Sequence, residues 1–325
     1  MKKVLVIGSN GQLGRCLADR YNTYQTHFIS TSDREIDLDY KFVDIETVDI
    51  TKAESIDDLF SDYRPDYVVN CAAYTNVPKA ETDQRTAYHV NEIGPGNLAK
   101  ACKSYDAKLI HISTDYVYNV NGLIDETTSF TEPLNIYGRS KLLGDLSVLD
   151  ENEENSIILR TAWLYSAYGT NFMKTMLNLF DKGVNSTKKN EIKVVCDQIG
   201  SPTSADSLAN VIFKIIKKSI ETNTFEYGIY NCTDEGFISW YDFAQAILDE
   251  KQSYSGILQT NNDIIPISTD EFNSDQLKNG KQIVRRPMIS LMNKAKIKKT
   301  FDIKLPYWRY SLIFTMHKYL SNTQN

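Results

Sequence analysis

The sequence has few cysteines, no long apolar run and no excess of basic residues. Its five cysteines are scattered over 325 residues, with neither Cys-x-x-Cys pairs nor the spacing of zinc ligands. We therefore expect reduced thiols, as in cytoplasmic proteins, and no metal site. No stretch approaches the roughly 20 apolar residues that cross a membrane, so no membrane association is expected. The apolar residues 4–7 end at Gly8, too early for a signal peptide, and predict a strand.

The charge balance is acidic. The formal net charge is −6 at pH 7, and lysines and arginines form no basic stripe. We therefore expect no nucleic-acid partner, and an anionic substrate would need cations placed locally. With 42% hydrophobic residues over its length, the chain can bury a full core and form two lobes.

A glycine-rich turn follows the apolar N-terminal segment. Residues 2–7 predict a strand buried in a parallel sheet, and Gly8, Gly11 and Gly14 come directly after it. Glycines at this spacing let the backbone approach a pyrophosphate, while the next helix points free N–H groups at the anion. Three glycines after a strand can equally form an ordinary turn. The turn is therefore a candidate dinucleotide site that other motifs must support.

A second strand is predicted at residues 26–30. Its end would lie beside the adenosine ribose of a dinucleotide, which makes Asp33 and Arg34 candidate contacts. A carboxylate there binds ribose hydroxyls and repels a 2′-phosphate, whereas a guanidinium binds that phosphate. We therefore expect use of both NADPH and NADH, with NADPH modestly favoured.

Tyr137 and Lys141 are the candidate chemical centre. They lie four residues apart in a segment, 135–149, whose leucines are spaced for burial in a helix, so both side chains would share one face. An ammonium stabilises a nearby phenolate and lowers the phenol's pKa, which makes a tunable proton donor. The spacing alone is common in surface helices. Its context is more specific, because a preceding strand ends in the hydroxyls of Ser113 and Thr114.

Strands and helices alternate along the first half of the chain. This order predicts an α/β fold, a Rossmann-like doubly wound parallel sheet with its ligand crevice at the carboxyl ends of the strands. Beyond residue 165 the pattern loosens. We expect a dinucleotide-binding domain at 1–165 and 200–231, and a smaller, discontinuous C-terminal substrate domain at 166–199 and 232–325.

The glycine turn, the strand-end hydroxyls and Tyr-x-x-x-Lys, in this order, resemble the extended short-chain dehydrogenase/reductase family. Further segments narrow the resemblance to its dTDP-4-dehydrorhamnose reductase members. They are NCAAYT (70–75), HISTDYVY (111–118), PLNIYG (133–138), RTAWLY (160–165), DQIGSPT (197–203) and RRP (285–287). Six separated motifs in the right order are far more specific than any one of them.

The resemblance implies an NAD(P)H-dependent oxidoreductase that reduces a 4-keto dTDP-sugar in the cytoplasm, in the biosynthesis of cell-surface polysaccharide. Tyr137 would protonate the nascent alkoxide, Thr114 would bind its oxygen with Ser113 in reserve, and Lys141 would hold the nicotinamide ribose. The resemblance also allows a homodimer.

Binding residues follow from the same motifs. The implied cofactor contacts are Gly8, Gly11, Gln12, Leu13, Gly14, Asp33, Arg34, Asp49, Ile50, Ala73, Tyr74, Thr75, Ser113, Tyr137 and Lys141. The implied substrate contacts are Thr114, Asp115, Tyr116, Trp163, Asn171, Phe172 and Arg286. The indole of Trp163 suits the apolar face of a deoxysugar, although a tryptophan at a strand end is core packing about as often. Lys174 is a weaker candidate that we expect at the surface.

Two positions depart from the family pattern. Cys16 stands where the family commonly has a glutamate associated with magnesium at a dimer contact, and Pro78 replaces an acidic residue. A thiol is a poor ligand for magnesium, so we expect activity without a metal.

Two other interpretations stay open. A sugar-nucleotide dehydratase or epimerase of the same superfamily uses the same Tyr/Lys pair, but dehydratases typically have a glutamate where this chain has Tyr116. A non-catalytic regulatory subunit of methionine adenosyltransferase resembles the same reductases. The intact Thr114, Tyr137 and Lys141 argue against that subunit.

Overall fold

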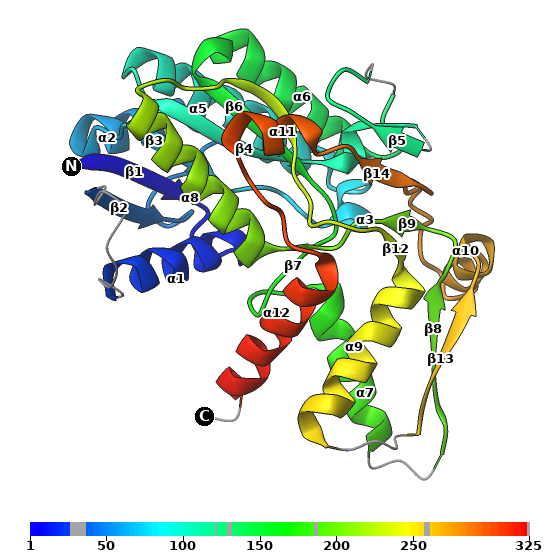
Figure 1. Ribbon diagram of the computed structural model, residues 1–325. Coiled ribbons are helices and arrows are strands. Elements are labelled where there is room, and N and C mark those ends of the chain that lie inside the picture. Colours follow the sequence, from blue (N-terminus) through cyan, green and yellow to red (C-terminus); the bar gives the residue numbers. More distant parts are fainter. Residues whose placement is uncertain (27–36, 121, 129–131, 185–187, 257–260, 324–325) are drawn as a thin grey trace.

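A parallel sheet of six strands forms the centre of the protein. The computed structural model describes residues 1–26, 37–120, 122–128, 132–184, 188–256 and 261–323 (Figure 1). The sheet has the order β11-β6-β4-β3-β1-β2, and each of these pairings is parallel. Its strands are β1 (Lys2–Ile7), β2 (Leu38–Val43), β3 (Tyr67–Asn70), β4 (Lys108–Thr114), β6 (Ser156–Thr161) and β11 (Gly228–Asn231). The predicted α/β doubly wound sheet is confirmed.

Helices cover both faces of this sheet. Along β1, Val4 and Val6 face one core while Leu5 and Ile7 face the other, and all four are buried. This alternation explains why a strand buried on both faces reads as one apolar run. The first face carries α1 (Gln12–Thr26) and α8 (Ala205–Thr222). The second carries α2 (Ala53–Tyr63), α5 (Gly94–Ser104) and α6 (Ile136–Asn152).

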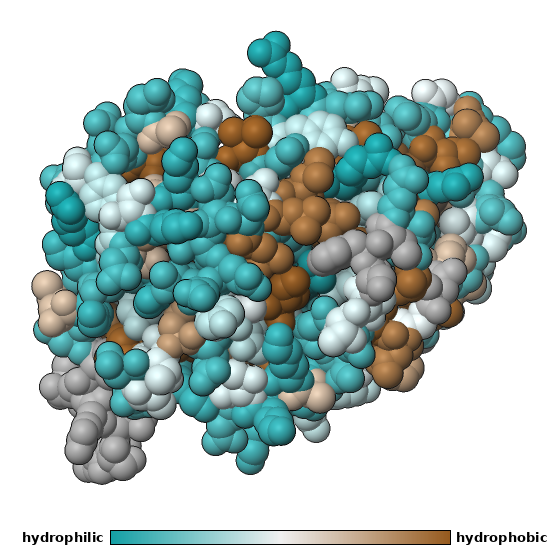
Figure 2. All heavy atoms as spheres, turned by 90° about the horizontal axis from the view of Figure 1, so that it is seen from above, coloured by the Kyte–Doolittle hydropathy of each residue, from teal (hydrophilic) through white to brown (hydrophobic). Residues whose placement is uncertain are grey.

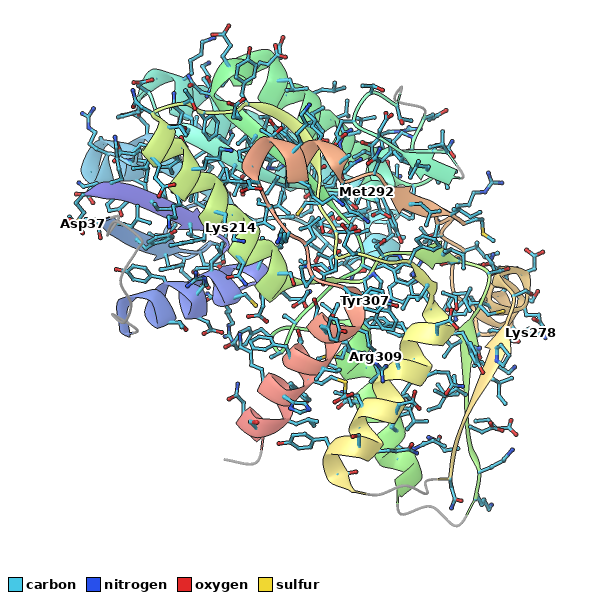
Figure 3. All side chains as sticks on the ribbon, in the orientation of Figure 1. Asp37, Lys214, Lys278, Met292, Tyr307 and Arg309 are labelled. Carbon is cyan, nitrogen blue, oxygen red and sulfur yellow. The ribbon has the colours of Figure 1, made fainter. Side chains whose placement is uncertain are left out.

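A second lobe lies below the sheet in Figure 1. It contains α7 (Phe172–Val184), β8 (Asn190–Val195), α9 (Trp240–Ser255), β13 (Asn262–Ile267), α10 (Thr269–Lys278) and α12 (Trp308–Thr323). Its core includes Phe180, Phe243 and Leu312 from three of these helices. Tyr307 and Arg309, labelled in Figure 3, mark the start of α12 beside the sheet.

The remaining described elements are short, apart from the seven-residue α11. They are α3 (Val77–Ala80), α4 (Gln84–Tyr88), η1 (His89–Ile93), η2 (Asp115–Val117), β5 (Gly122–Ile124), η3 (Glu153–Asn155), β7 (Leu164–Tyr165), β9 (Ile199–Gly200), β10 (Thr203–Ser204), β12 (Ile238–Ser239), β14 (Ser290–Met292) and α11 (Ala295–Phe301). Helix α11 belongs to the predicted second domain. Its residues Ile297 and Phe301 nevertheless pack in the same core as α8, against the central sheet. The domain boundaries stay a prediction.

The strand beside β1 is not the predicted one. β1 pairs over its whole length with β2, from Lys2 opposite Leu38 to Ile7 opposite Val43. Residue 26 of the predicted strand is the last residue of α1, while Asp33 and Arg34 lie outside the described residues. The strand end beside the glycine turn is therefore at residues 43 and 44.

Polar residues cover most of one face of the protein (Figure 2). Figure 2 shows a face that is largely hydrophilic, with hydrophobic residues in a band across its middle. Within the described ranges, no helix combines the length and the apolar character that a membrane span requires.

Candidate functional site

Two adjoining cavities lie at the carboxyl ends of the central strands. The first, about 310 Å³, is bordered by the residues that follow β1, β2 and β3; its lining includes Gly8, Gly11, Asp44, Asp49, Ile50 and Ala73. The second, about 620 Å³, reaches from the glycine turn to the second lobe; its lining includes Gly11, Gln12, Leu13, Ala73, Thr75, Ser113, Thr114, Asp115, Tyr116, Tyr137, Lys141, Trp163, Asn171, Trp240 and Arg286. Because Gly11 and Ala73 line both, a ligand could extend across the two.

The turn between β1 and α1 has the shape of a diphosphate cradle. Gly8 has φ +82°, and a Cβ there would lie 2.6 Å from the backbone that follows β3. A Cβ on Gly14 would lie 2.4 Å from the carbonyl oxygen of Gly8, so the turn closes without room for larger side chains. α1 begins at Gln12, and the N–H groups of a helix's first turn are available to an anion. These residues fit a dinucleotide.

Asp44 lies at the end of β2, where the sequence interpretation had placed Asp33 and Arg34. Its Oδ2 accepts a hydrogen bond of 2.7 Å from the backbone N–H of Asn10, and its Oδ1 accepts one of 2.8 Å from that of Ile45. The carboxylate thus holds the glycine turn against the second strand and borders the smaller cavity. Correct strand limits would have revealed Asp44, because it directly follows the alternating segment 38–43.

Asp49 and Ile50 form another wall of the smaller cavity. Oδ1 of Asp49 accepts hydrogen bonds from the backbone N–H and the hydroxyl of Thr51, at 3.1 and 2.7 Å. These bonds, and an ion pair with Lys52, lower the pKa of Asp49. Ile50 packs against Gly94, where a Cβ would lie 2.6 Å from its side chain.

Tyr137, Thr114 and Lys141 meet at the larger cavity. Asn135 caps α6 by accepting a hydrogen bond of 2.8 Å from the backbone N–H of Gly138, which places Tyr137 and Lys141 one turn apart at the start of the helix. Thr114 ends β4; its hydroxyl donates a hydrogen bond of 3.1 Å to Oδ1 of Asp115, and it lines the same cavity as Tyr137. A proton donor and an oxygen-binding hydroxyl thus share one point of the cavity.

The pKa of Tyr137 moves opposite to the sequence-based expectation. Burial raises the pKa of its phenol, and the neighbouring hydroxyl of Thr114 lowers it only in part. Lys141 is not among the groups that shift this pKa, and its Nζ donates a hydrogen bond of 2.7 Å to the carbonyl oxygen of Ile112, which lines the same cavity. Tyr137 is therefore a protonated phenol at neutral pH, which is the form that a proton donor requires.

The residues after Thr114 form the wall above it. Asp115 is buried, and its Oδ2 accepts a hydrogen bond of 2.7 Å from the hydroxyl of Ser290. Burial raises the pKa of Asp115 to about 6. The ring of Tyr116 lies edge-on to that of Tyr137, with centroids 5.6 Å apart. The hydroxyl of Ser113 is buried and has no hydrogen-bond partner among the described residues.

Two tryptophans form the opposite wall. The indole rings of Trp163 and Trp240 are parallel within 8°, with centroids 3.6 Å apart, and both line the larger cavity. Trp163 has φ +49°, and a Cβ on Gly200 would lie 2.6 Å from its ring. The sequence interpretation missed Trp240, although Ser239 marks the start of its helix. Its stacking on Trp163 joins residues far apart in the chain, so no local sequence pattern could predict it.

Asn171 borders the larger cavity but is occupied by structural contacts. Its Nδ2 donates a hydrogen bond of 2.8 Å to Oε1 of Gln12, and its Oδ1 accepts one of 3.1 Å from the backbone N–H of Lys174. The ammonium of Lys174 lies over the ring of Tyr319, 5.1 Å from its centroid. Arg286 lines the cavity as the expected cation.

Of the implied contacts that the structure describes, three do not line either cavity: Gly14, Tyr74 and Phe172. Gly14 packs beneath the turn. The hydroxyl of Tyr74 donates to Oδ2 of Asp83 at 3.3 Å, so its side chain is directed away. Phe172 packs against Trp240 and the core of the second lobe. We therefore no longer expect the side chains of Tyr74 and Phe172 to contact ligands.

The region around Cys16 holds an ammonium between carboxylates. Nζ of Lys318 lies 2.6 Å from Oδ2 of Asp19 and 2.6 Å from Oδ1 of Asp206. Cys16 is buried, and burial raises the pKa of its thiol. The described residues contain no group of three or more His, Cys, Asp or Glu side chains arranged to hold a metal ion.

Comparisons with known proteins give a consistent result. Residues 1–321 match the family model described as RmlD substrate binding domain. The chain is 34% identical over 314 residues to the dTDP-4-dehydrorhamnose reductase of Aggregatibacter actinomycetemcomitans, covering 96% of this chain and 97% of that protein. It is similar to the dTDP-4-dehydrorhamnose reductase of Bacillus anthracis in complex with NADP, with 33% identity, a TM-score of 0.80 and coverage of 98% and 99%. It is also similar to a dTDP-4-dehydrorhamnose reductase of Clostridium acetobutylicum, with 35% identity and a TM-score of 0.79, over 99% of this chain and 100% of that one.

Proposed function

The chain belongs to the RmlD family of dTDP-4-dehydrorhamnose reductases, and from this premise we propose that it reduces the 4-keto group of dTDP-4-dehydro-L-rhamnose to dTDP-L-rhamnose. The electron donor is NADPH or NADH, and the step is the last one in dTDP-rhamnose biosynthesis for cell-surface polysaccharide. The observation that carries the proposal is the convergence of Thr114, Tyr137 and Lys141 on a cavity that also includes the glycine turn.

The chemistry divides between the coenzyme and three side chains. The reduced nicotinamide, when bound, supplies a hydride to C4 of the sugar. The hydroxyl of Tyr137 gives its proton to the oxygen that gains charge at C4. Thr114, which lines the same cavity as Tyr137, would keep that oxygen beside the phenol. Lys141 supplies positive charge next to the phenol as it loses its proton.

The smaller cavity fits the adenosine half of the coenzyme. The turn containing Gly8, Gly11 and Gly14 would receive the diphosphate, and Asp49 and Ile50 would border the adenine. Asp44 would accept hydrogen bonds from the ribose hydroxyls. Asp33 and Arg34 stay predicted contacts outside the described residues.

The far end of the larger cavity suits a sugar nucleotide. The stacked indoles of Trp163 and Trp240 offer an apolar wall to a deoxysugar, while Tyr116 lies opposite beside Tyr137. Arg286 would provide the local cation that the diphosphate of a dTDP-sugar needs in a chain of net charge −6.

An assay with defined substrates tests the function. The purified protein is mixed with NADPH and enzymatically made dTDP-4-dehydro-L-rhamnose, and both coenzyme oxidation and the product are followed. Formation of dTDP-L-rhamnose supports the proposal, and a C4 epimer of it would identify a related 6-deoxyhexose reductase. A folded protein that oxidises neither NADPH nor NADH under these conditions would instead favour a dehydratase, an epimerase or a non-catalytic homologue. Tyr116, in place of a glutamate, argues against the dehydratase.

Partners and location stay predictions beyond the nucleotide sugar. We propose a cytoplasmic enzyme without a nucleic-acid partner, which follows from its net charge and scattered cysteines. The family resemblance allows a homodimer, which size-exclusion chromatography with light scattering can test.

A further inference from the structure

A connected group of buried polar side chains lies beneath the reaction cavity. Lys141 is 2% exposed, and His111, Asp145 and Arg160 are fully buried. They come from three neighbouring elements: β4 carries His111, α6 carries Lys141 and Asp145, and β6 carries Arg160. Burying charged groups is costly unless they are paired and hydrogen-bonded, so the arrangement of this group matters.

Asn70 determines which nitrogen of His111 carries the proton. Oδ1 of Asn70 accepts a hydrogen bond of 3.1 Å from the backbone N–H of Ala72, so its Nδ2 is the atom that faces Nδ1 of His111, at 3.0 Å. Nδ1 must then accept, and the neutral ring carries its proton on Nε2. Burial and the charge of Lys141 both lower the pKa of His111, which keeps the ring neutral.

The protonated Nε2 of His111 faces Lys141. It lies 3.3 Å from Nζ of Lys141 and 3.9 Å from Oδ1 of Asp145. An ammonium and an N–H group are both donors, so they can lie this close only where an acceptor offsets them. Oδ1 of Asp145 receives no hydrogen bond from any described residue, so it offsets the two donors through its negative charge.

The other oxygen of Asp145 is fixed by Arg160. Nε of Arg160 donates a hydrogen bond of 3.0 Å to Oδ2 of Asp145, and Nη1 of Arg160 donates one of 2.8 Å to the hydroxyl of Tyr118. The carboxylate is therefore held with Oδ2 against the guanidinium and Oδ1 on the side of His111, whose Nε2 also faces the ammonium of Lys141. Burial lowers the pKa of Lys141 to about 8, and the charge of Asp145 opposes that shift.

We propose that Asp145, oriented by Arg160 and flanked by His111, is a positioning residue that keeps Lys141 charged and directed at the reaction cavity. The inference rests on the proposed function, because that function gives Lys141 its task. Other titratable groups near Lys141 are Tyr137, which precedes it by one turn, and Asp115 and Tyr116 from η2, which line the same cavity.

Titration of the Lys141 ammonium tests this proposal without substrate or coenzyme. The protein is labelled with ¹⁵N in its lysine side chains, and the Nζ resonance is followed by NMR as the pH changes, with Lys141→Met identifying the signal. We expect a midpoint near 8 in the parent. Removing the nearby negative charge with Asp145→Asn should lower the midpoint by about one pH unit or more. Asp145→Glu keeps the charge and should stay within about half a unit of the parent.

Two further measurements keep the test decisive. Asp145→Asn removes the carboxylate that faces the buried guanidinium of Arg160, which can prevent folding, so the double variant Asp145→Asn/Arg160→Gln is prepared beside it. A folded variant with the parent's midpoint would overturn the proposal and leave Asp145 as a structural partner of Arg160. The parent protein also tests the proposal by itself. A Lys141 amine that is already neutral at pH 7 in the parent would contradict the proposal. Failure of the reductase assay would leave this titration unaffected, so the two proposals can fail separately.

Discussion

Nδ2 of Asn171 donates a hydrogen bond of 2.8 Å to Oε1 of Gln12, which ties the start of α7 to the coenzyme turn. The hydroxyl of Ser166 donates to the same oxygen at 3.1 Å. Through these bonds the second lobe holds the first residue of α1. The amide of Asn171 is therefore already engaged, although the family resemblance assigns it to the substrate.

Asn171→Ala should weaken coenzyme binding more than sugar-nucleotide binding. Loss of one hydrogen bond, about 1 kcal/mol, corresponds to a rise of roughly fivefold in the KM for NADPH. Steady-state kinetics with each substrate varied in turn measures this difference. Lys174→Ala, one turn along α7, is the matched control and should change neither constant. A rise confined to the KM of the sugar nucleotide would restore Asn171 as a substrate contact.

Tyr137→Phe should fold normally and lose turnover. Removing a positioned general acid lowers kcat by roughly 10²- to 10⁴-fold, while NADPH affinity measured by fluorescence stays close to that of the parent. Tyr74→Phe removes a hydroxyl whose side chain is directed away from both cavities and should retain kcat. Full turnover by Tyr137→Phe would remove this phenol from the mechanism.

Trp240→Ala should raise the KM of the sugar nucleotide. The substitution removes one stacked indole from the cavity wall, and we expect a rise of about tenfold, or 1.4 kcal/mol. Phe237→Ala is the control, since that ring is 61% exposed and lies three residues earlier. An unchanged KM in Trp240→Ala, with a raised one in Trp163→Ala, would mean that Trp163 alone forms the apolar wall.

Asp44 should disfavour NADPH. Asp44→Asn removes the negative charge at the end of β2, so the ratio of the KM values for NADPH and NADH should fall by about tenfold. Glu46→Gln, two residues on and exposed, should leave the ratio unchanged. Arg34→Ala should raise the KM for NADPH by roughly tenfold and spare NADH, if its guanidinium binds the 2′-phosphate as the sequence predicts. Equal effects on both coenzymes would exclude these assignments.

Activity should survive exhaustive chelation. The ammonium of Lys318 already bridges Asp19 and Asp206, beside a buried thiol in place of the family's glutamate. We expect the same kcat with EDTA and with added magnesium, measured after dialysis. Strong inhibition by EDTA that magnesium reverses would demonstrate a metal site. Lys318→Met then shows whether this ammonium competes with the metal.

The features that the sequence predicted are local ones. Three glycines at fixed spacing after an apolar strand, and a tyrosine and a lysine one helical turn apart, depend on contacts within a few residues. The second strand was misplaced because β2 is an edge strand with a half-exposed face. Its sequence alternates between apolar and polar residues instead of forming an apolar run, so it lacks the signal that identified the strands buried on both faces.

The misses depend on residues far apart in the chain. The leucine spacing in 135–149 predicts a buried apolar face, yet Leu146 is 40% exposed while Lys141 and Asp145 are buried. The burial of Asp145 depends on its hydrogen bond with Arg160, which lies on β6. No local sequence pattern predicts this contact. Trp240 likewise reaches the cavity by stacking on a residue 77 positions earlier in the chain.

The contact between Gly200 and Trp163 limits how this site can vary. The indole fills the space that any side chain at position 200 would need, so mutations at the two positions cannot be tolerated independently. In a library randomised at both, large residues at 200 should survive selection only beside small residues at 163. Positions 163 and 200 are therefore expected to change together, and a change of sugar preference at the wall that contains Trp163 would require substitutions at both.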